Sequence, residues 1–202
     1  MDNRRYGRIE LVGKNEKHFM CPTMALADGI KCCAVVYRNG ERIVVYNKML
    51  KELRLPKGIL FMSFFDKMKD LAATRPLFMG FPSGDSIDNM DILGCSAEEI
   101  RHFFDAHEYV VCTSRQIRYG GASLFVPGVM QRIGSAIGDF YVLPTSVNEF
   151  GIVPCTKKSD VDDLKSFLVR SNKEASATHR KDIISDSVFR YFADTNTFKA
   201  IA

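Results

Sequence analysis

A chain of 202 residues with 46% hydrophobic and 26% charged residues has the length and composition of a globular protein with one large domain or two small ones. It contains no signal-peptide pattern and no apolar run of about 18 residues, so we expect a cytoplasmic protein with no membrane partner and with reduced cysteines. The pI near 8.7 lies below the range typical of dedicated nucleic-acid-binding domains.

The charges are unevenly spread along the chain. Residues 1–60 carry twelve Lys and Arg against six Asp and Glu, whereas residues 83–108 carry seven acids against Arg101 alone. Such asymmetry indicates either a partner surface of opposite charge or two solvated faces of one protein. Residues 1–25 are polar and basic, with weak strand character at Arg8–Val12, and we interpret them as a basic N-terminal arm or an edge segment.

The first firm element is a hairpin. Two β-rich runs, 33–37 and 42–46, flank Asn39-Gly40, and Asn-Gly supplies the positive φ angles of a two-residue type I′ turn. Helices are expected next, a short one over Lys48–Arg54 and a longer one over Ile59–Ala73. The longer helix places apolar residues on one broad stripe, which core packing explains without a cofactor.

A loop is expected at residues 76–95, which are rich in Pro, Gly and polar residues. Ser96 and Glu99 then have the spacing of a capping box, so a helix should begin there and run to about Ala106. We predict a single α+β domain over residues 26–202. Two subdomains, 26–75 and 96–202, joined by the loop are the alternative.

The second half repeats the order of the first. Tyr109–Thr113 and Gly121–Val126 are expected strands, and a helix is expected over Gly128–Ile137, which would give two ββα-like halves. The chain should close with a hairpin (140–143 and 149–153), a helix (160–172) and a strand (185–192). The predicted fold class is α+β, with a mixed or antiparallel sheet built from hairpins and helices packed mainly on one face.

The most polar turn of the chain is the best candidate for a site. Pro144, Thr145, Ser146, Asn148 and Glu149 gather hydroxyls, an amide and a carboxylate between two apolar strands. They either present Ser146 and Glu149 to a ligand or satisfy the backbone of a tight turn. A serine nucleophile also needs a base within reach. The histidines are all distant in sequence: His18, His102, His107 and His179.

No metal site and no cofactor are predicted. Cys32 and Cys33 are adjacent, which directs their side chains to opposite faces of a strand, and His102 and His107 do not share a helix face. Gly120-Gly121 lacks the lysine and the glycine spacing of a phosphate-binding loop.

Nucleic-acid binding is a further alternative. Basic residues interleaved with an aromatic residue can follow a phosphate backbone and stack a base. Arg115, Arg118 and Tyr119 lie together in one expected loop, and Arg4, Arg5 and Arg8 lie in the arm.

Two segments carry a family resemblance. Leu143–Glu149 resembles the "yilPSSiHE" segment of an uncharacterised bacterial family, found mainly in clostridia, and Ser185–Tyr191 is similar to its closing "SdSvYrY" segment. The resemblance implies no assigned activity. This chain has Asn148 where the family typically has His, and an amide cannot act as a general base, so the resemblance lowers the expectation of catalysis.

Taken together, these features predict a non-catalytic protein that binds a macromolecule, most simply another protein. An inhibitor derived from a phage or a mobile element fits by analogy. A hydrolase that uses Ser146 and Glu149 remains the enzymatic alternative, and the oligomeric state is left open.

Overall fold

The computed structural model describes residues 6–14, 20–81, 87–107, 109–156, 160–177 and 182–202. Its strands are β1 (Tyr6–Val12), β2 (Thr23–Ala27), β3 (Ile30–Arg38), β4 (Glu41–Val44), β5 (Pro76–Phe81), β6 (Asp88–Asp91), β7 (Tyr109–Ser114), β8 (Phe140–Ser146), β9 (Glu149–Pro154), β10 (Phe189–Phe192) and β11 (Thr197–Ala200). Its helices are α1 (Asn47–Glu52), α2 (Lys57–Asp70), α3 (Ala97–Ala106), α4 (Val129–Ile137), α5 (Val161–Ala177) and the 3-10 helix η1 (Gly120–Phe125).

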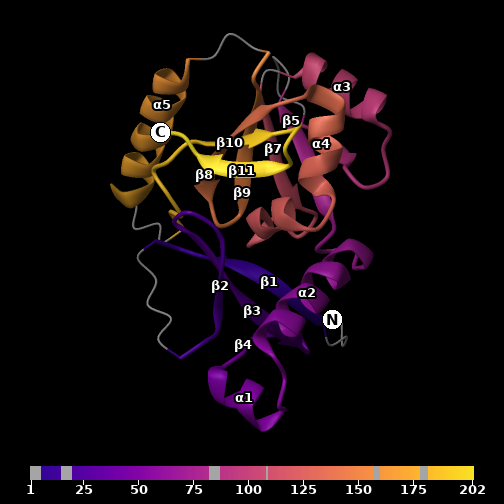
Figure 1. Cartoon of the computed structure of the whole chain (residues 1–202), viewed down its shortest axis with the longest axis vertical. Coiled ribbons are helices and arrows are strands. Elements are labelled where there is room, and N and C mark those ends of the chain that lie inside the picture. The colour runs from indigo at the N-terminus through magenta and orange to yellow at the C-terminus, as the bar shows by residue number, and fades with distance from the viewer. Residues whose placement is uncertain (1–5, 15–19, 82–86, 108, 157–159, 178–181) are drawn as a thin grey trace.

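The described strands form two antiparallel sheets, which confirms the α+β class (Figure 1). In the smaller sheet, β3 pairs with β1 on one side and with β2 and β4 on the other. The predicted hairpin joins β3 to β4, with Asn39 at φ 54° and Gly40 at φ 81°. The local turn chemistry therefore acts as expected.

The larger sheet has the strand order β11-β10-β8-β9-β7-β5-β6. Neighbouring residues of β8 face opposite sides, so Val142 joins the core beneath α3 and α4 while Leu143 packs with Leu168 of α5. Figure 1 shows the sheet between these helices. α3 and α4 therefore cover one face of this sheet and α5 covers part of the other, since both faces are apolar.

The two sheets share one buried apolar cluster. Ile9 and Ile30 of the small sheet belong to the same cluster as Phe78 and Phe150 of the large sheet. β1 packs against η1, and Leu11 lies close to Gly121. β1, which lies within the predicted arm, is thus part of the core, since Arg8 and Glu10 pair with each other and can be buried despite their charges.

Three further expectations are corrected. Residues 76–95 were expected as a loop but contain β5 and β6, which pair with each other, and β5 also pairs with β7. Gly121–Val126 was expected as a strand but lies in η1, so the ββα order is not repeated. Ser146 pairs directly with Glu149, so the turn contains only Val147 and Asn148.

The remaining element predictions agree with the structure. The capping box is present, since Ser96 Oγ accepts the Glu99 N–H at 3.2 Å and Glu99 accepts the Ser96 N–H at 2.6 Å. α4 and α5 lie close to their expected positions, and β10 falls within the expected closing strand. The hairpin partner β11 was not foreseen.

Candidate functional site

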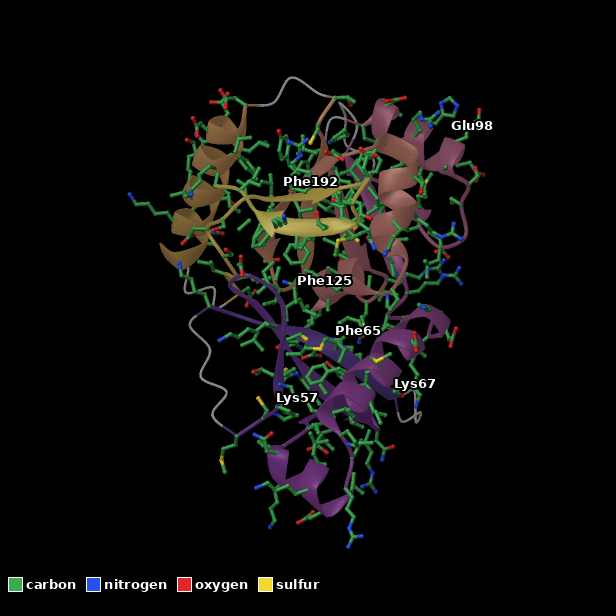
Figure 2. All side chains as sticks on the ribbon, in the orientation of Figure 1. Lys57, Phe65, Lys67, Glu98, Phe125 and Phe192 are labelled. Carbon is green, nitrogen blue, oxygen red and sulfur yellow. The ribbon has the colours of Figure 1, made fainter. Side chains whose placement is uncertain are left out.

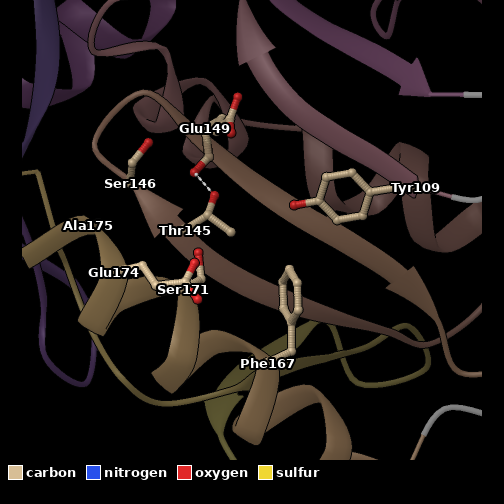
Figure 3. Close-up of a pocket in the computed structure, with 8 residues that line it drawn as sticks. All are labelled: Tyr109, Thr145, Ser146, Glu149, Phe167, Ser171, Glu174 and Ala175. Atoms are coloured by element: carbon tan, nitrogen blue, oxygen red, sulfur yellow. Dashed lines mark hydrogen bonds between the residues drawn. The ribbon is translucent and has the colours of Figure 1, made fainter. Parts of the chain in front are cut away.

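The predicted polar turn lies at one wall of an open cleft of about 840 Å³ between the β8–β9 hairpin and α5 (Figure 3). The cleft brings together three of the predicted residues, Thr145, Ser146 and Glu149. Asn148 is not among the lining residues. The other lining residues are Tyr109, Phe167, Ser171, Glu174 and Ala175.

The hydroxyl groups of this turn serve the backbone. Thr145 Oγ1 donates to the carbonyl of Glu149 at 2.9 Å, and Ser146 Oγ accepts the N–H of Asn148 at 3.1 Å. Both are bonds that polar side chains make when they stabilise a chain reversal. Burial, followed by the charge of Glu149, raises the pKa of Tyr109, so its hydroxyl stays protonated at neutral pH.

No histidine lines the cleft in the part of the chain that the structure describes. His102 lies exposed on α3, and His107 is buried elsewhere, with its ring nitrogens 2.6 Å from the Phe103 carbonyl and 2.9 Å from Asp88. His18 and His179 lie outside the described residues. The described cleft therefore offers hydroxyls and carboxylates but no imidazole base for a serine nucleophile.

Asn148 instead fastens a second predicted segment. Its Oδ1 accepts the N–H of Tyr119 at 2.8 Å, and its backbone carbonyl accepts Thr113 Oγ1 at 2.7 Å. Tyr119 has φ 58°, a left-handed conformation that is uncommon for a large residue. The amide at position 148 thus holds the loop 115–119 in place, which connects the two candidate groups of the sequence through the backbone.

Tyr119 is the centre of a cluster of arginine side chains. The guanidinium carbons of Arg42, Arg118 and Arg8 lie 5.0, 5.4 and 5.6 Å from the centre of its ring. These distances are within the range of cation–π attraction. We call Arg8, Tyr37, Arg42, Arg118 and Tyr119 the arginine–tyrosine cluster.

One buried carboxylate holds this cluster together. Glu10 is fully buried; its Oε1 accepts from Arg8 Nε at 2.8 Å and from the Tyr37 hydroxyl at 2.9 Å, and its Oε2 accepts from Arg42 Nε at 2.8 Å. Burial and the Glu10 charge raise the pKa of Tyr37 to about 12. Arg8 and Arg42 therefore share a single carboxylate while Arg118 adds a third guanidinium group, so the cluster carries an excess of positive charge.

A groove runs past this cluster. A cavity of about 700 Å³ is lined by Tyr6, Tyr37, Asn39, Arg115 and Gln116, among others. A neighbouring cavity of about 470 Å³ shares Arg115 with it, and another of about 500 Å³ shares Tyr6 and Leu71. We call these three adjoining cavities the arginine–tyrosine groove.

The structure brings Arg118 and Tyr119 beside Arg8, and Arg115 lines the groove with Tyr6 and Tyr37, whereas Arg4 and Arg5 lie outside the described residues. Sequence reasoning missed Tyr6, Tyr37 and Arg42. A signal was present only for the face that Tyr6 shares with Arg8 and Glu10, since these residues alternate along a strand; which other strand lies beside that face is not visible in the sequence.

Exposed apolar side chains gather elsewhere, around α1 and the start of α2. Met20, Leu53 and Met62 are the most exposed large hydrophobic residues in the described chain, at 72%, 70% and 69%. Tyr46 and Ile59 are also exposed, at 48% and 57%, and the Met20 carbonyl accepts the Asn47 N–H, which places Met20 beside α1. We call these five residues the α1–α2 tip. Exposed basic residues accompany it: Lys48, Lys51, Arg54 and Lys57.

Comparisons with known proteins give one match. A model of a family described as "Family of unknown function (DUF5688)" matches residues 33–192, in agreement with the resemblance to an uncharacterised family. No curated protein and no solved structure matches the chain. Among the described residues, every helix is too short or too polar to cross a lipid bilayer.

Proposed function

The chain belongs to a family of unknown function (DUF5688), and because membership assigns no activity, we propose from its surface that the protein acts by binding another protein at the α1–α2 tip. An inhibitor derived from a phage or a mobile element would act in this way and falls within the proposal.

The exposure of Met20, Leu53 and Met62 is the observation that carries this proposal. Soluble proteins expose single apolar side chains everywhere, but a concentration of them in one region marks an interaction surface. Half of the large exposed apolar residues in the described chain belong to the tip. Transfer of such side chains from water to an interface is favourable by about 25 cal/mol for each Å² of apolar surface buried.

The charges around the tip indicate the kind of partner. Residues 46–58 contain four basic side chains against Glu52 alone. Complementary charges at an interface rim steer association and reject partners of the wrong sign. We therefore expect a partner whose contact surface has an apolar centre and an acidic rim. In Figure 2, Lys57 lies in the half of the molecule with α1 and α2, whereas the acidic residue Glu98 lies in the other half.

Affinity purification from the native host, with quantification of the bound proteins, tests the proposal. The double substitution Leu53→Ser with Met62→Ser should abolish retention of a partner that the unaltered protein retains. Both residues are on the surface, so the change in folding free energy should stay within about 0.5 kcal/mol. Val169→Ser with Ile201→Ser is the matched control, since these residues are exposed at 43% and 39% outside the tip.

Charge substitution supplies a second test. Lys48→Glu with Lys51→Glu should slow association at low salt, and high salt should reduce the difference, because exposed charges act through a screened field. If every retained protein binds the tip variants and the control variant equally well, the proposal is wrong.

A further inference from the structure

A second surface has properties that the tip lacks. The arginine–tyrosine groove combines flat aromatic rings, side-chain amides and the Arg115 guanidinium group along three adjoining cavities. Of the two carboxylates that line it, Asp91 is paired with Arg75, while Asp70 lies in the same cavity as Lys67. It lies where the small sheet meets the loop after β7, so residues from distant parts of the chain form it together. The inference drawn from it is independent of the proposed protein-binding tip.

The aromatic part of the groove is a preformed platform. The rings of Tyr6 and Tyr37 are stacked, with centres 5.1 Å apart and planes only 8° from parallel. The Tyr6 hydroxyl lies 3.5 Å from Gln116 Oε1, and Tyr37 is held by Glu10 and Arg8. A ring whose orientation is fixed in this way loses little conformational entropy when a planar ligand stacks on it.

The groove and the loop beside it have charge available for a ligand. Arg115 lines the groove, and Arg118 lies three residues further along the same loop; within the described residues, both are exposed and take part in no ion pair. Arg118 stacks on Tyr119, and its carbonyl accepts a hydrogen bond from Arg8 at 3.0 Å, which holds the loop against the cluster. The one carboxylate at the centre, Glu10, is already shared by Arg8 and Arg42.

These features fit a ligand that alternates anionic groups with flat rings. Phosphates bind guanidinium groups through paired N–H donors, and nucleobases stack on aromatic side chains. Asn39 and Gln116 line the same cavity; the Asn39 amide can donate to and accept from the edge of a base, and the Gln116 amide, whose Oε1 accepts from Arg8 at 2.6 Å, can donate through its NH₂ group. In a duplex the bases are stacked on each other and their faces are covered, so an aromatic platform selects unpaired strands.

We infer that the arginine–tyrosine groove binds a single strand of nucleic acid, with a base stacked on Tyr6 and the phosphate backbone on Arg115 and Arg118. The cavity that shares Arg115 and the cavity that shares Tyr6 extend the path for neighbouring nucleotides in the two directions. The amides at Asn39 and Gln116 impose at most a modest preference for particular bases.

Fluorescence anisotropy with a short labelled oligothymidylate tests the inference, because unpaired thymidines offer bases and phosphates without secondary structure. The full chain should bind the oligonucleotide at low salt, and the logarithm of the affinity should fall linearly with the logarithm of the salt concentration. Arg115→Gln and Arg118→Gln should each reduce that slope by about 0.7, the contribution of one phosphate contact in a single strand. Arg170→Gln on α5 is the matched control, since Arg170 is also exposed but does not line the groove.

The stacking step is tested separately. Tyr6→Leu keeps an apolar side chain on Tyr37 but removes the flat ring, and it should weaken binding by about tenfold or more while the salt slope is retained. Duplex DNA of the same length and inorganic polyphosphate serve as competitors. Both should compete more weakly than the unlabelled single strand.

Three outcomes would overturn the inference. Absence of binding at low salt would mean that the groove is not a site for nucleic acid. If polyphosphate competed as well as the unlabelled single strand, and Tyr6→Leu bound as tightly as the unaltered protein, the groove would have only a general attraction for anions. Tighter binding of the duplex would mean that the bases are not read through their faces. Thermal unfolding of each variant checks that it remains folded.

Discussion

The buried ion network beneath the groove supports a quantitative prediction. Glu10 is 0% exposed and Arg8 is 1% exposed, so both charges are removed from water and each relies on the other. Replacement of Glu10 by Gln keeps the volume of the side chain but leaves the Arg8 guanidinium without a counter-charge. When one partner of a buried pair is removed, the folded state typically loses about 3–5 kcal/mol.

Urea unfolding followed by circular dichroism measures this loss. With a slope of about 2 kcal/mol per molar urea, Glu10→Gln should lower the unfolding midpoint by roughly 2 M and leave the slope unchanged. Asp66→Asn is the matched control, because the Lys69–Asp66 pair lies on the helix surface with Asp66 63% exposed, and such pairs contribute about 0–1 kcal/mol.

A double substitution separates charge from packing. Arg8→Met with Glu10→Leu removes both charges together, and since a buried pair can often be replaced by apolar residues at little cost, this variant should be more stable than Glu10→Gln. A loss below about 1 kcal/mol for Glu10→Gln would contradict the reasoning, because it would mean that water reaches Arg8.

Two further predictions concern stability. Gly120→Ala should lower the free energy of unfolding by about 1–3 kcal/mol in chemical denaturation, because a Cβ atom would lie 2.8 Å from the backbone carbonyl oxygen of Asn148. Gly58→Ala is the control, since a Cβ atom there meets nothing within 4 Å and should cause no such loss. Equal free energies of unfolding for the two variants would refute the close approach at Gly120. The pKa of Asp139 is lowered by the Ala193 N–H, at 2.8 Å, and by Arg190, at 2.7 Å. Its folded pKa is below its unfolded value of about 3.9, so its stabilisation is present above that pH and is lost as the pH falls through the folded pKa. Asp139→Asn should therefore flatten the acid limb of stability against pH, and an unchanged limb would contradict this.

The candidate sites show where sequence reasoning reached its limit. The sequence directed attention to Thr145, Ser146 and Glu149, and these do line one cleft, yet their hydroxyls bind the backbone. It also grouped Arg115, Arg118 and Tyr119, which are neighbours in the chain. It missed Tyr6 and Tyr37, because they come from two strands whose pairing register is not visible in a single sequence.

Several elements were determined by the sequence alone. The Asn39-Gly40 turn needs only positive φ angles at two adjacent residues, and the Ser96 and Glu99 caps bond to backbone groups three residues away. The apolar stripe of α2 likewise follows from the 3.6-residue period, and Leu60, Phe61, Phe65 and Met68 are buried as that period requires. In each case the residues that cause the element to form lie within a few positions of one another, so a short stretch of sequence is enough to predict it.

Only the tertiary structure decided the rest. The segment 120–125 has the composition of a strand, but Gly120 lies against the backbone of Ser114 and Asn148, and the chain turns into η1 there. The burial of Arg8 and Glu10 likewise depends on hydrogen bonds to Tyr37, to Arg42 and to a loop more than a hundred residues along the chain. Burial of a charge is decided by the partners that enclose it, and folding brings those partners together from positions that no local pattern connects.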